Sequence, residues 1–521
     1  MDKPFCLNLS MENSLSKSSG KGGLGSLMAC LFHQAYEEDY PLILVSLLYP
    51  YKSKQKKIDN IIETTSTIAE NNLEDFGIEI VVRSNWYDTK LRVFKYPLSN
   101  KAIAFFLYLG LEKNEEWLKR LEVYGEHDEG QVLLTRYLLA EGAIELMKKL
   151  ELDFDVLHLQ ESDTALAIKP ALSYNKNTKI IYTIHTPMSH GHKSFSIEKI
   201  ISLYGNIPKE FEPGIKNGRL YLTDLASHYA CKIFTVSKIQ VDIEKNRQPI
   251  HSEKISSISN AVHKRWINEH LKKLFDNELS GWRQNIYKLR EASKIEDYKI
   301  EEVLKKTRED LVRKFESWYR EGEVLSNFSS IPKNVKIFTF AKRIVPYKRP
   351  LEFLKIIEKY GSNNSVYIFS GVLCAMEEYE REFLKTFAKV LEEKKIAFVL
   401  NFNEEKAYYL VSGSDFWVNI PISWMEASGT SHMKASVNGR ITISTPFGTV
   451  IEYVKHGYNG ILVDNNLTDL AEKLSFCESL TPKEYILFSK NCISSSPYIL
   501  MERMFGEYKE QYIKAWKEKG L

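Results

Sequence analysis

Short apolar runs alternate with amphipathic helical stretches along most of the chain, and this alternation limits its fold more than any other feature. In the first half, the runs have the length and apolar content of buried strands. The strands predicted there are Leu42–Leu48, Ile78–Val82, Val156–Leu159, Ile180–Ile184 and Ile233–Val236, with helices such as 24–36 and 130–150 between them. Strands that alternate with helices predict parallel sheets with helices on both faces.

The alternation returns in the second half, after a stretch of a different kind. Residues 268–322 are strongly charged, lack proline, and carry Leu, Ile, Trp and Tyr at steps of three and four, which is typical of amphipathic helices. The strands predicted beyond this stretch are Val335–Phe340, Val366–Phe369, Ala397–Leu400, Phe416–Ile420, Ile441–Ser444 and Ile461–Val463, followed by a helix over Leu500–Trp516.

The sum of these elements is an α/β protein with two doubly wound, Rossmann-like lobes. A chain of 521 residues is also long enough for two or three domains. The expected boundaries are 1–265 for the N-terminal lobe, 266–330 for a helical insert or crossover, 331–495 for the C-terminal lobe and 496–521 for a C-terminal helix. Ligands of such sheets bind beyond the carboxyl ends of the strands, so we expect the functional residues there.

Composition excludes several classes of protein. The net charge of +3 and the 44% of hydrophobic residues are typical of a soluble protein and favour neither nucleic acid nor membrane as a partner. The longest apolar runs, Pro41–Tyr51 and Ala102–Leu111, fall short of the roughly 20 residues that a membrane span needs. The six cysteines form no CxxC pair, which favours a reducing compartment, and we expect a cytoplasmic protein.

A glycine-rich turn lies between an early predicted strand and a predicted helix, over residues 19–26. Glycine lets the backbone approach a ligand closely, and the start of a helix offers free N–H groups. Gly22 and Gly23 therefore indicate a cradle for a phosphate or for sugar hydroxyls, with a mobile surface turn as the alternative. The spacing is not that of a Walker A loop.

Three histidines follow the predicted strand Ile180–Ile184. His185 stands at the strand end, where active-site residues collect, and we expect it in the functional cleft. His190 and His192 complete the group, but no carboxylate or thiol lies at a spacing that would help them to bind a metal. We therefore predict no metal site.

Four cations lie within eight residues after the strand Val335–Phe340: Lys342, Arg343, Lys348 and Arg349. Like charges at this density repel one another unless an anion joins them. Arginine offers a planar fork for phosphate and lysine a mobile point charge. The pattern favours a phosphate site, with a solvated or RNA-binding patch as the alternative.

The most specific segment is Glu426–Gly439, EASGTSHMKASVNG, which follows the strand Phe416–Ile420. Its small residues suit a tight turn, in which Thr430 or Ser431 caps a helix and Gly439 ends it. We expect Lys434 near the helix start, where the helix dipole and nearby cations disfavour its charged form. A neutral amine is the form that condenses with an aldehyde.

These segments together resemble the glycogen and α-glucan phosphorylases, glycosyltransferase family 35. The segment Glu426–Gly439 resembles their pyridoxal-phosphate segment, 342–349 their basic run, and 22–25 their glycine loop. The residues around His185 and His192 resemble the short, prokaryotic branch of the family. The resemblance covers roughly residues 8–270 and 335–465.

The resemblance implies a GT-B fold and phosphorolysis of terminal α-1,4-linked glucosyl units to glucose 1-phosphate, with retention at the anomeric carbon. α-Glucan and inorganic phosphate would be the substrates, and pyridoxal 5′-phosphate would be the cofactor, whose own phosphate relays a proton. The implied catalytic residues are His185, Arg343 and Lys348; the implied cofactor-binding residues are Lys434, Lys342, Gly22, Gly23 and Thr430; the implied glucose-binding residues are Leu24, Asn260, Glu426, Ser428 and Gly429.

The chain departs from the family at several positions. Gln160–Asp163 replaces a run that ends in histidine, Val372 replaces a lysine, and Phe447 replaces an acidic residue. These changes leave two alternatives open: a nucleotide-sugar glycosyltransferase without pyridoxal phosphate, and a glucan-binding protein without catalysis. The sequence also leaves open whether the C-terminal helix docks on the first lobe or pairs with another subunit.

Overall fold

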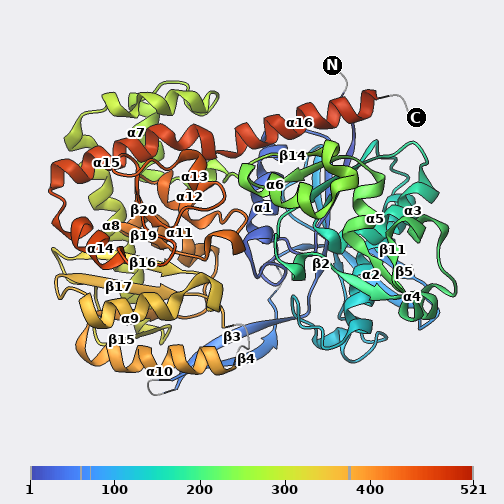
Figure 1. The fold of residues 1–521 in the computed structure, drawn as a ribbon, viewed down its shortest axis with the longest axis horizontal. Helices are drawn as coiled ribbons and strands as arrows, with labels where there is room; N and C mark the ends of the chain where they lie inside the picture. Colours follow the sequence, from blue (N-terminus) through green and yellow to red (C-terminus); the bar gives the residue numbers. More distant parts are fainter. Residues whose placement is uncertain (1–2, 59–60, 71, 374–376, 519–521) are drawn as a thin grey trace. The chain divides into compact units, whose positions relative to one another are not determined.

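Two α/β units make up the computed structural model, which describes residues 3–58, 61–70, 72–373 and 377–518 (Figure 1). Unit 1 comprises Met1–Ser53, Ser66–Asn260 and Met504–Leu521, and unit 2 comprises Lys54–Thr65 and Ala261–Arg503. No helix within the described residues is both long and apolar enough to cross a membrane. The cysteines Cys6, Cys30, Cys231, Cys477 and Cys492 are free, and Cys374 lies outside the described residues.

A nine-stranded sheet forms the centre of unit 1, in the order β14-β13-β9-β8-β1-β2-β7-β6-β5. The strands are β1 (Cys6–Leu9), β2 (Leu42–Leu48), β5 (Glu74–Val82), β6 (Thr89–Lys95), β7 (Ala102–Tyr108), β8 (Val156–Gln160), β9 (Lys179–Ile184), β13 (Ala230–Thr235) and β14 (Ile255–Ser257). The sheet is parallel from β14 to β7, whereas β6 and β5 add an antiparallel edge.

The helices of unit 1 bury the apolar faces of this sheet. They are α1 (Gly23–Glu37), α2 (Glu129–Lys149), α3 (Ile168–Tyr174), α4 (Ile197–Tyr204), α5 (Leu222–Tyr229) and α6 (Lys238–Arg247). In α2, Asp128 caps the first turn by accepting a hydrogen bond from the N–H of Gln131. Between β9 and α5, the chain also forms a small three-stranded sheet in the order β10 (Ser194–Ser196), β12 (Arg219–Tyr221) and β11 (Ile215–Lys216). The core joins residues from β1, β2, β8 and α2, among them Leu7, Val45, Leu157 and Ile144.

A seven-stranded sheet forms the centre of unit 2, in the order β15-β18-β17-β16-β19-β20-β21. The strands are β15 (Val324–Ser326), β16 (Lys336–Ala341), β17 (Ser365–Ser370), β18 (Ile396–Val399), β19 (Phe416–Asn419), β20 (Ile441–Ser444) and β21 (Gly460–Leu462). All neighbours are parallel except β15 and β18. Aromatic rings fill the centre, where Phe338 stacks on Phe416 and Tyr367 at centroid distances of 4.7 and 5.4 Å.

The helices of unit 2 include the charged stretch that the sequence indicated. They are α7 (Glu269–Glu278), α8 (Asp297–Arg320), α9 (Pro350–Tyr360), α10 (Glu377–Glu393), α11 (Glu404–Gly413), α12 (Ser431–Ser436), α13 (Val450–Tyr453), α14 (Leu470–Ser479) and α15 (Pro482–Ser495). Between α7 and α8 the chain forms a 3-10 helix, Ile286–Lys294. Helix α8 buries Ile300, Leu311 and Phe315 and leaves its charged face to solvent.

Two segments belong to a unit that their place in the sequence did not suggest. The strands β3 (Tyr51–Ile58) and β4 (Ile61–Ile68) form a hairpin whose residues 54–65 belong to unit 2. Gln55 explains this, because its backbone and side chain exchange three hydrogen bonds of 2.7–2.9 Å with Asn401. Helix α16 (Met501–Lys517) belongs to unit 1 from Met504 onward, and its Tyr512 packs against Tyr40.

The parallel part of each sheet reverses its strand order at one point, and the loops at that point are the natural place for a ligand. In unit 1, β1 lies between β2 and β8, so the loops after β1 and β8 open at the reversal. In unit 2, β16 lies between β17 and β19, so the loops after β16 and β19 do the same. Doubly wound sheets bind ligands at such switch points.

Candidate functional site

The basic run begins at the carboxyl end of β16, at the switch point of unit 2. Its backbone is fixed by the neighbouring strand, because the N–H of Lys342 donates to the carbonyl of Ser370 at 2.9 Å. A Cβ on Gly371 would lie 1.7 Å from the carbonyl oxygen of Lys342, and Gly371 has a φ of +148°. Only glycine fits this close approach, which sets where the run starts.

The amine of Lys342 is buried and faces no carboxylate among its hydrogen-bond partners in the described residues. Lys342 is 8% exposed, and its Nζ donates to Ser431 Oγ at 2.9 Å. Ser431 Oγ also accepts from Trp417 Nε1 at 3.1 Å, so this hydroxyl ties the basic run to the segment that carries Lys434. Burial lowers the pKa of Lys342 to about 7, because water no longer stabilises the charged form.

Lys348 lies on the same side of the switch point and forms a buried ion pair with Glu426. Burial, then the charges of Lys342 and Arg343, lower the pKa of Lys348. Arg343 is exposed, and its Nη2 donates to the hydroxyl of Tyr347 at 3.0 Å. The structure therefore brings Lys342, Lys348 and Glu426 together, as the strand-end positions indicated.

Lys434 is also buried, and its amine lies over an aromatic ring. Lys434 is 8% exposed, and its Nζ is 3.7 Å from the centroid of the Trp266 ring, a cation–π contact. The side-chain amide of Asn438 donates to the carbonyls of both Trp266 and Lys434, at 2.7 and 2.8 Å. Asn438 therefore holds the lysine and the ring against each other.

The helix that carries Lys434 differs from the predicted one, and that prediction was wrong in two respects. Helix α12 has six residues, so Lys434 lies in its last turn and not near its start. Thr430 precedes the helix, but its side chain accepts no capping hydrogen bond. The helix dipole therefore does not favour the neutral amine of Lys434, contrary to the prediction. Gly439, with a φ of +69°, follows the helix as expected.

His432 adds a neutral polar group to this cluster. It is fully buried, stacks on Tyr453 at 5.8 Å, and has no hydrogen-bond partner for its Nε2 within the described residues. Burial, then the charges of Lys342 and Lys348, lower its pKa well below the usual value. The Nε1 of Trp266 is likewise buried without a partner in the part of the chain described here. Buried donors without a partner are rare in folded proteins.

Around the unit 2 switch point, Lys342 and Arg343 lie close enough to lower the pKa of Lys348, and a bound anion would relieve this repulsion. A bound anion stabilises the charged form of Lys342, so above pH 7 its binding should take up a proton. We expect sulfate, which does not titrate here, to bind with uptake of about one proton at pH 8 and of almost none at pH 6. Calorimetry in buffers of different ionisation enthalpy measures this uptake.

The control for this experiment is Lys342→Met, which removes the titrating amine and keeps the chain length. Proton uptake should fall in that variant, while His432 stays neutral throughout because its pKa is so low. Sulfate binding without any proton uptake at pH 8 in the unchanged protein would contradict the role of this amine.

In unit 1, the glycine turn lies at the switch point after β1 and already binds a carboxylate. Glu12 is 4% exposed, and its Oε2 accepts from the N–H groups of Lys21 and Gly22 at 3.0 and 2.6 Å. The N–H of Gly22 is thus occupied, whereas a Cβ on Gly23 would meet nothing within 4 Å. Leu24 follows, partly exposed, in the first turn of α1. Glu12 is a residue that we did not single out from the sequence.

His185 follows β9 directly and is held by two neighbours from the end of β8. Its Nε2 lies 2.7 Å from Gln160 Oε1, and its backbone N–H donates to Glu161 Oε2 at 3.0 Å. Burial lowers the pKa of His185 to about 3, so the ring is neutral. Glu161 has φ and ψ of +71° and 162°, a strained conformation for a residue with a side chain, and burial raises its pKa to about 8. Strain beside a candidate site indicates function.

The other two histidines do not join His185 in a metal site. His192 Nδ1 lies 2.9 Å from Thr223 Oγ1, and its Nε2 contacts Arg247. His190 is exposed. Within the described residues, no group of three histidine, cysteine or acidic side chains is placed to hold a metal ion.

The residues that replace the family's histidine and lysine have structural partners. Asp163 accepts from Arg136 Nε at 2.6 Å, and Arg136 also pairs with Glu126, which forms a buried triad. Val372 contributes its carbonyl oxygen, which accepts from the N–H of Ile344 at 3.0 Å. Asp163 therefore serves the core of unit 1.

The remaining predicted glucose-binding residues lie in loops of their own units. In unit 2, Ser428 Oγ is 2.9 Å from Thr449 Oγ1, and a Cβ on Gly429 would lie 3.6 Å from Glu426 Oε1. In unit 1, Asn260 is 4% exposed, and its N–H donates to the carbonyl of Val236 at 3.0 Å.

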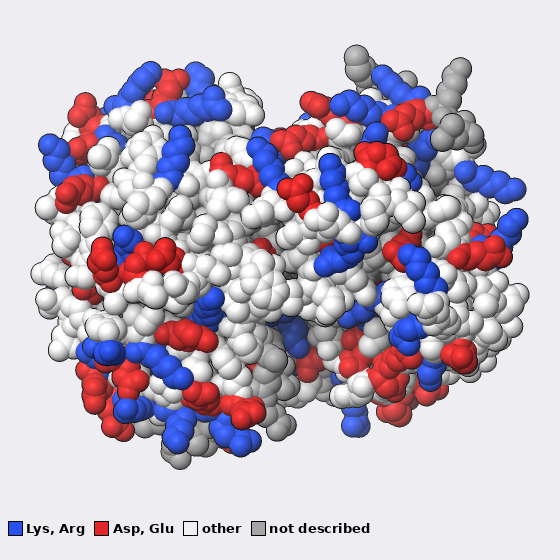
Figure 2. All heavy atoms as spheres, in the orientation of Figure 1, with Lys and Arg blue, Asp and Glu red and all other residues white. Residues whose placement is uncertain are grey.

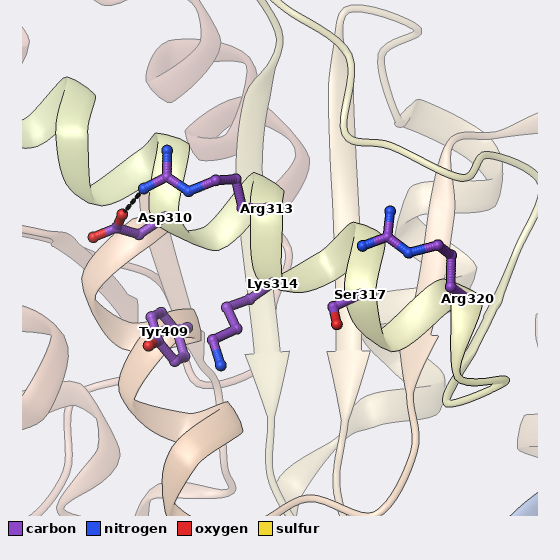
Figure 3. Close-up of a pocket in the computed structure, with 6 residues that line it drawn as sticks. All are labelled: Asp310, Arg313, Lys314, Ser317, Arg320 and Tyr409. Carbon is purple, nitrogen blue, oxygen red and sulfur yellow. Dashed lines mark hydrogen bonds and ion pairs between the residues drawn. The ribbon is translucent and has the colours of Figure 1, made fainter.

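Two shallow cavities elsewhere in unit 2 contain none of these residues. One, of about 420 Å³, lies between α8 and α11 and is lined by Asp310, Arg313, Lys314, Ser317, Arg320 and Tyr409 (Figure 3). The other, of about 350 Å³, lies between α7 and α8. Acidic and basic side chains are interspersed over the face shown in Figure 2, as the small net charge leads one to expect.

Comparisons with known proteins match two kinds of glucan enzyme: family models indicate a starch-synthase-like glycosyltransferase, whereas the similar curated proteins are phosphorylases. A model of the family "Glycosyl transferases group 1" matches residues 322–490, and one of the family "Starch synthase catalytic domain" matches residues 10–242. The chain is 26% identical to the maltodextrin phosphorylase of Thermococcus litoralis over 89% of its own length and 63% of the relative's. It is 24% identical to the glycogen phosphorylase of Aquifex aeolicus, over 96% of the chain and 84% of that relative.

A solved structure supports the fold. The catalytic domain of starch synthase IV from Arabidopsis thaliana, bound to ADP and acarbose, superposes with a TM-score of 0.73 at 14% identity and covers 99% of this chain and 100% of that one. This likeness confirms the predicted α/β fold with two Rossmann-like lobes. The fold and the family models agree at one level: the chain is a protein of the GT-B glycosyltransferase type.

Proposed function

We propose that the protein is an α-glucan phosphorylase, which releases terminal α-1,4-linked glucosyl units of a maltodextrin or glycogen as glucose 1-phosphate, with retention. The observation that carries the proposal is the pair of buried amines at the unit 2 switch point, Lys342 and Lys434, each 8% exposed. Two phosphates, one from the substrate and one from a cofactor, would neutralise such a cluster. The phosphorylases of Thermococcus and Aquifex, which match along most of this chain, support the same conclusion.

The residues present fit pyridoxal 5′-phosphate. Lys434 offers a buried amine for its aldehyde, and Lys342 offers a second buried amine for its phosphate. Thr430 completes the proposed set in unit 2. In unit 1, the backbone at Gly23 is open to a ligand, whereas Glu12 would have to release the N–H of Gly22 before that group could bind one. The unpartnered Nε1 of Trp266 beside Lys434 is a further donor that a polar ligand would satisfy. When bound, the cofactor would supply a phosphate group that exchanges a proton with the substrate phosphate.

The chain's own residues then divide the work. Arg343 and Lys348 bind the substrate phosphate, and Glu426 pairs with Lys348 beside it. Glu426, Ser428 and Gly429 orient the glucosyl hydroxyls. In unit 1, Leu24 and Asn260 line the sugar site, and the neutral ring of His185 binds the glucose without adding a positive charge beside the developing oxocarbenium ion.

A second candidate is a nucleotide-sugar glycosyltransferase without pyridoxal phosphate. The starch synthase model over residues 10–242 and the likeness to a starch synthase bound to ADP favour it. In that reaction the cations Lys342, Arg343 and Lys348 would bind the diphosphate of the donor, and Lys434 would remain an ordinary amine on Trp266.

The two candidates differ in an absorbance spectrum of the purified protein. A phosphorylase should show the absorbance of lysine-bound pyridoxal phosphate, and borohydride should fix the cofactor on the peptide that contains Lys434. Addition of inorganic phosphate and maltodextrin should then release glucose 1-phosphate. A colourless protein that binds no added pyridoxal phosphate and extends maltodextrin from a nucleotide sugar would overturn the proposal in favour of the second candidate.

A further inference from the structure

A chain of buried hydrogen bonds in unit 1 leads from the C-terminal helix to His185. It begins at Tyr512 on α16, whose hydroxyl lies 2.8 Å from Nδ1 of His158 on β8. The other ring nitrogen of His158 lies 2.8 Å from Thr183 Oγ1 on β9. Gln160, two residues after His158 on the same face of β8, reaches both that ring and His185. Every member except His185 is buried.

The Gln160 amide directs its nitrogen toward His158 and its oxygen toward His185. Its Nε2 lies 3.2–3.3 Å from the ring nitrogens of His158, and its Oε1 lies 2.7 Å from His185 Nε2. An amide oxygen only accepts hydrogen bonds, so the Nε2 of His185 must carry the proton. The Nδ1 of a neutral ring then has its lone pair available as an acceptor.

We propose that Gln160 is a positioning residue, which holds the proton of His185 on Nε2 and so presents Nδ1 as the acceptor for a sugar hydroxyl. His158, fixed between Tyr512 and Thr183, keeps the Gln160 amide in the required orientation. The inference rests on the proposed sugar-binding role of His185 and adds the group that prepares its ring. Helix α16 then helps to hold His158 in place. Two of its residues one turn apart, Tyr508 and Tyr512, pack against the His158 ring at centroid distances of 5.1 and 5.6 Å.

The burial of His158 and His185 is consistent with this assignment, which rests on the hydrogen-bond geometry. Burial lowers the pKa of both His158 and His185 to about 3, so neither ring acquires a second proton near neutral pH. A neutral imidazole carries one proton, and the neighbouring hydrogen-bond partners determine which of its two nitrogens holds that proton. With Gln160 Oε1 as the acceptor for His185 Nε2, the tautomer of His185 is set before substrate binds.

The test uses the whole protein and two readouts. Nitrogen NMR of histidine-labelled protein without substrate gives the tautomer of His185, whose signal is assigned by its absence in His185→Gln. We expect the proton on Nε2 in the unchanged protein and in Gln160→Glu, which keeps an oxygen acceptor. In Gln160→Leu, we expect a mixture of tautomers and a loss of kcat/KM for glucan of about 10- to 100-fold.

A matched control separates positioning from general loosening of the core. Tyr508→Phe removes the hydroxyl 3.1 Å from Thr183 Oγ1, in the same network, without touching Gln160. It should lower Tm and leave the His185 tautomer unchanged. A proton on Nδ1 in the unchanged protein would overturn the proposal, as would a Gln160→Leu variant with unaltered tautomer and kcat/KM. Because the NMR readout needs no substrate, it stands whether the donor proves to be glucan and phosphate or a nucleotide sugar.

Discussion

Lys434→Met should lose pyridoxal phosphate and lower phosphorolysis by about 10³-fold or more, while the protein stays folded. The variant removes the amine that would bind the cofactor but keeps a chain of similar length. Methionine packs well against an aromatic ring, so the contact with Trp266 survives in apolar form. Because Lys434 is only 8% exposed and methionine carries no charge to desolvate, Tm should stay unchanged or rise. Absorbance, Tm and release of glucose 1-phosphate measure the three outcomes.

The matched control is Lys406→Met, at a second buried lysine of unit 2 that lies near a tryptophan ring. Lys406 Nζ is 5.8 Å from the centroid of Trp318 and pairs with Glu323 at 2.6 Å. This variant should lose stability, because Glu323 loses its partner, and should keep the cofactor absorbance. If Lys434→Met retained phosphorolysis, the cofactor assignment would be refuted.

Arg343→Ala should raise the KM for phosphate by about 10- to 100-fold and change the KM for glucan less than twofold. Arg343 is the exposed cation of the run, whereas Lys342 and Lys348 are buried and already bound to Ser431 and Glu426. Its planar fork suits two oxygens of one phosphate. Initial rates over a grid of phosphate and maltodextrin concentrations separate the two constants.

Arg349→Ala is the control for Arg343→Ala, because it removes the same side chain from the same run. Arg349 donates to the carbonyl of Asn465 and has a φ of +61°, which alanine tolerates no better than arginine. We expect both substrate constants to stay near those of the unchanged protein. A change in the glucan constant alone, in Arg343→Ala, would show that the basic run does not bind phosphate.

Strands that are buried on both faces could be predicted from the sequence almost to the residue. The segments Leu42–Leu48 and Ile441–Ser444 are β2 and β20 as predicted, because a fully buried strand reads as one apolar run. Strand β1 was expected ahead of the glycine turn but without bounds, since Asn8, which is buried opposite His158, interrupts its short apolar run. The hairpin of β3 and β4 was missed because its residues are mostly polar, and docking through Gln55 is a tertiary effect.

Part of the candidate site could likewise be predicted from the sequence, and part could not. A strand end followed by cations or by a small-residue turn is visible in a sequence, and the structure brings Lys342 to Ser431 across 89 residues. The helix over Lys434 was misjudged, because the sequence pattern did not reveal that α12 stops after six residues. Glu12 could have been suspected from its place ahead of the glycine turn, but its contact with Gly22 depends on how the intervening loop folds.

That carboxylate has a consequence for what the turn can select. The Glu12 carboxylate already accepts hydrogen bonds from the N–H groups of Lys21 and Gly22. It therefore neutralises much of the positive end of the α1 dipole before a ligand binds. At Gly22 the turn would then favour an uncharged sugar hydroxyl over an anion, so the phosphate contact proposed at this residue requires that Glu12 first release the N–H. An engineer who wanted this lobe to accept an acidic substrate would have to begin at position 12.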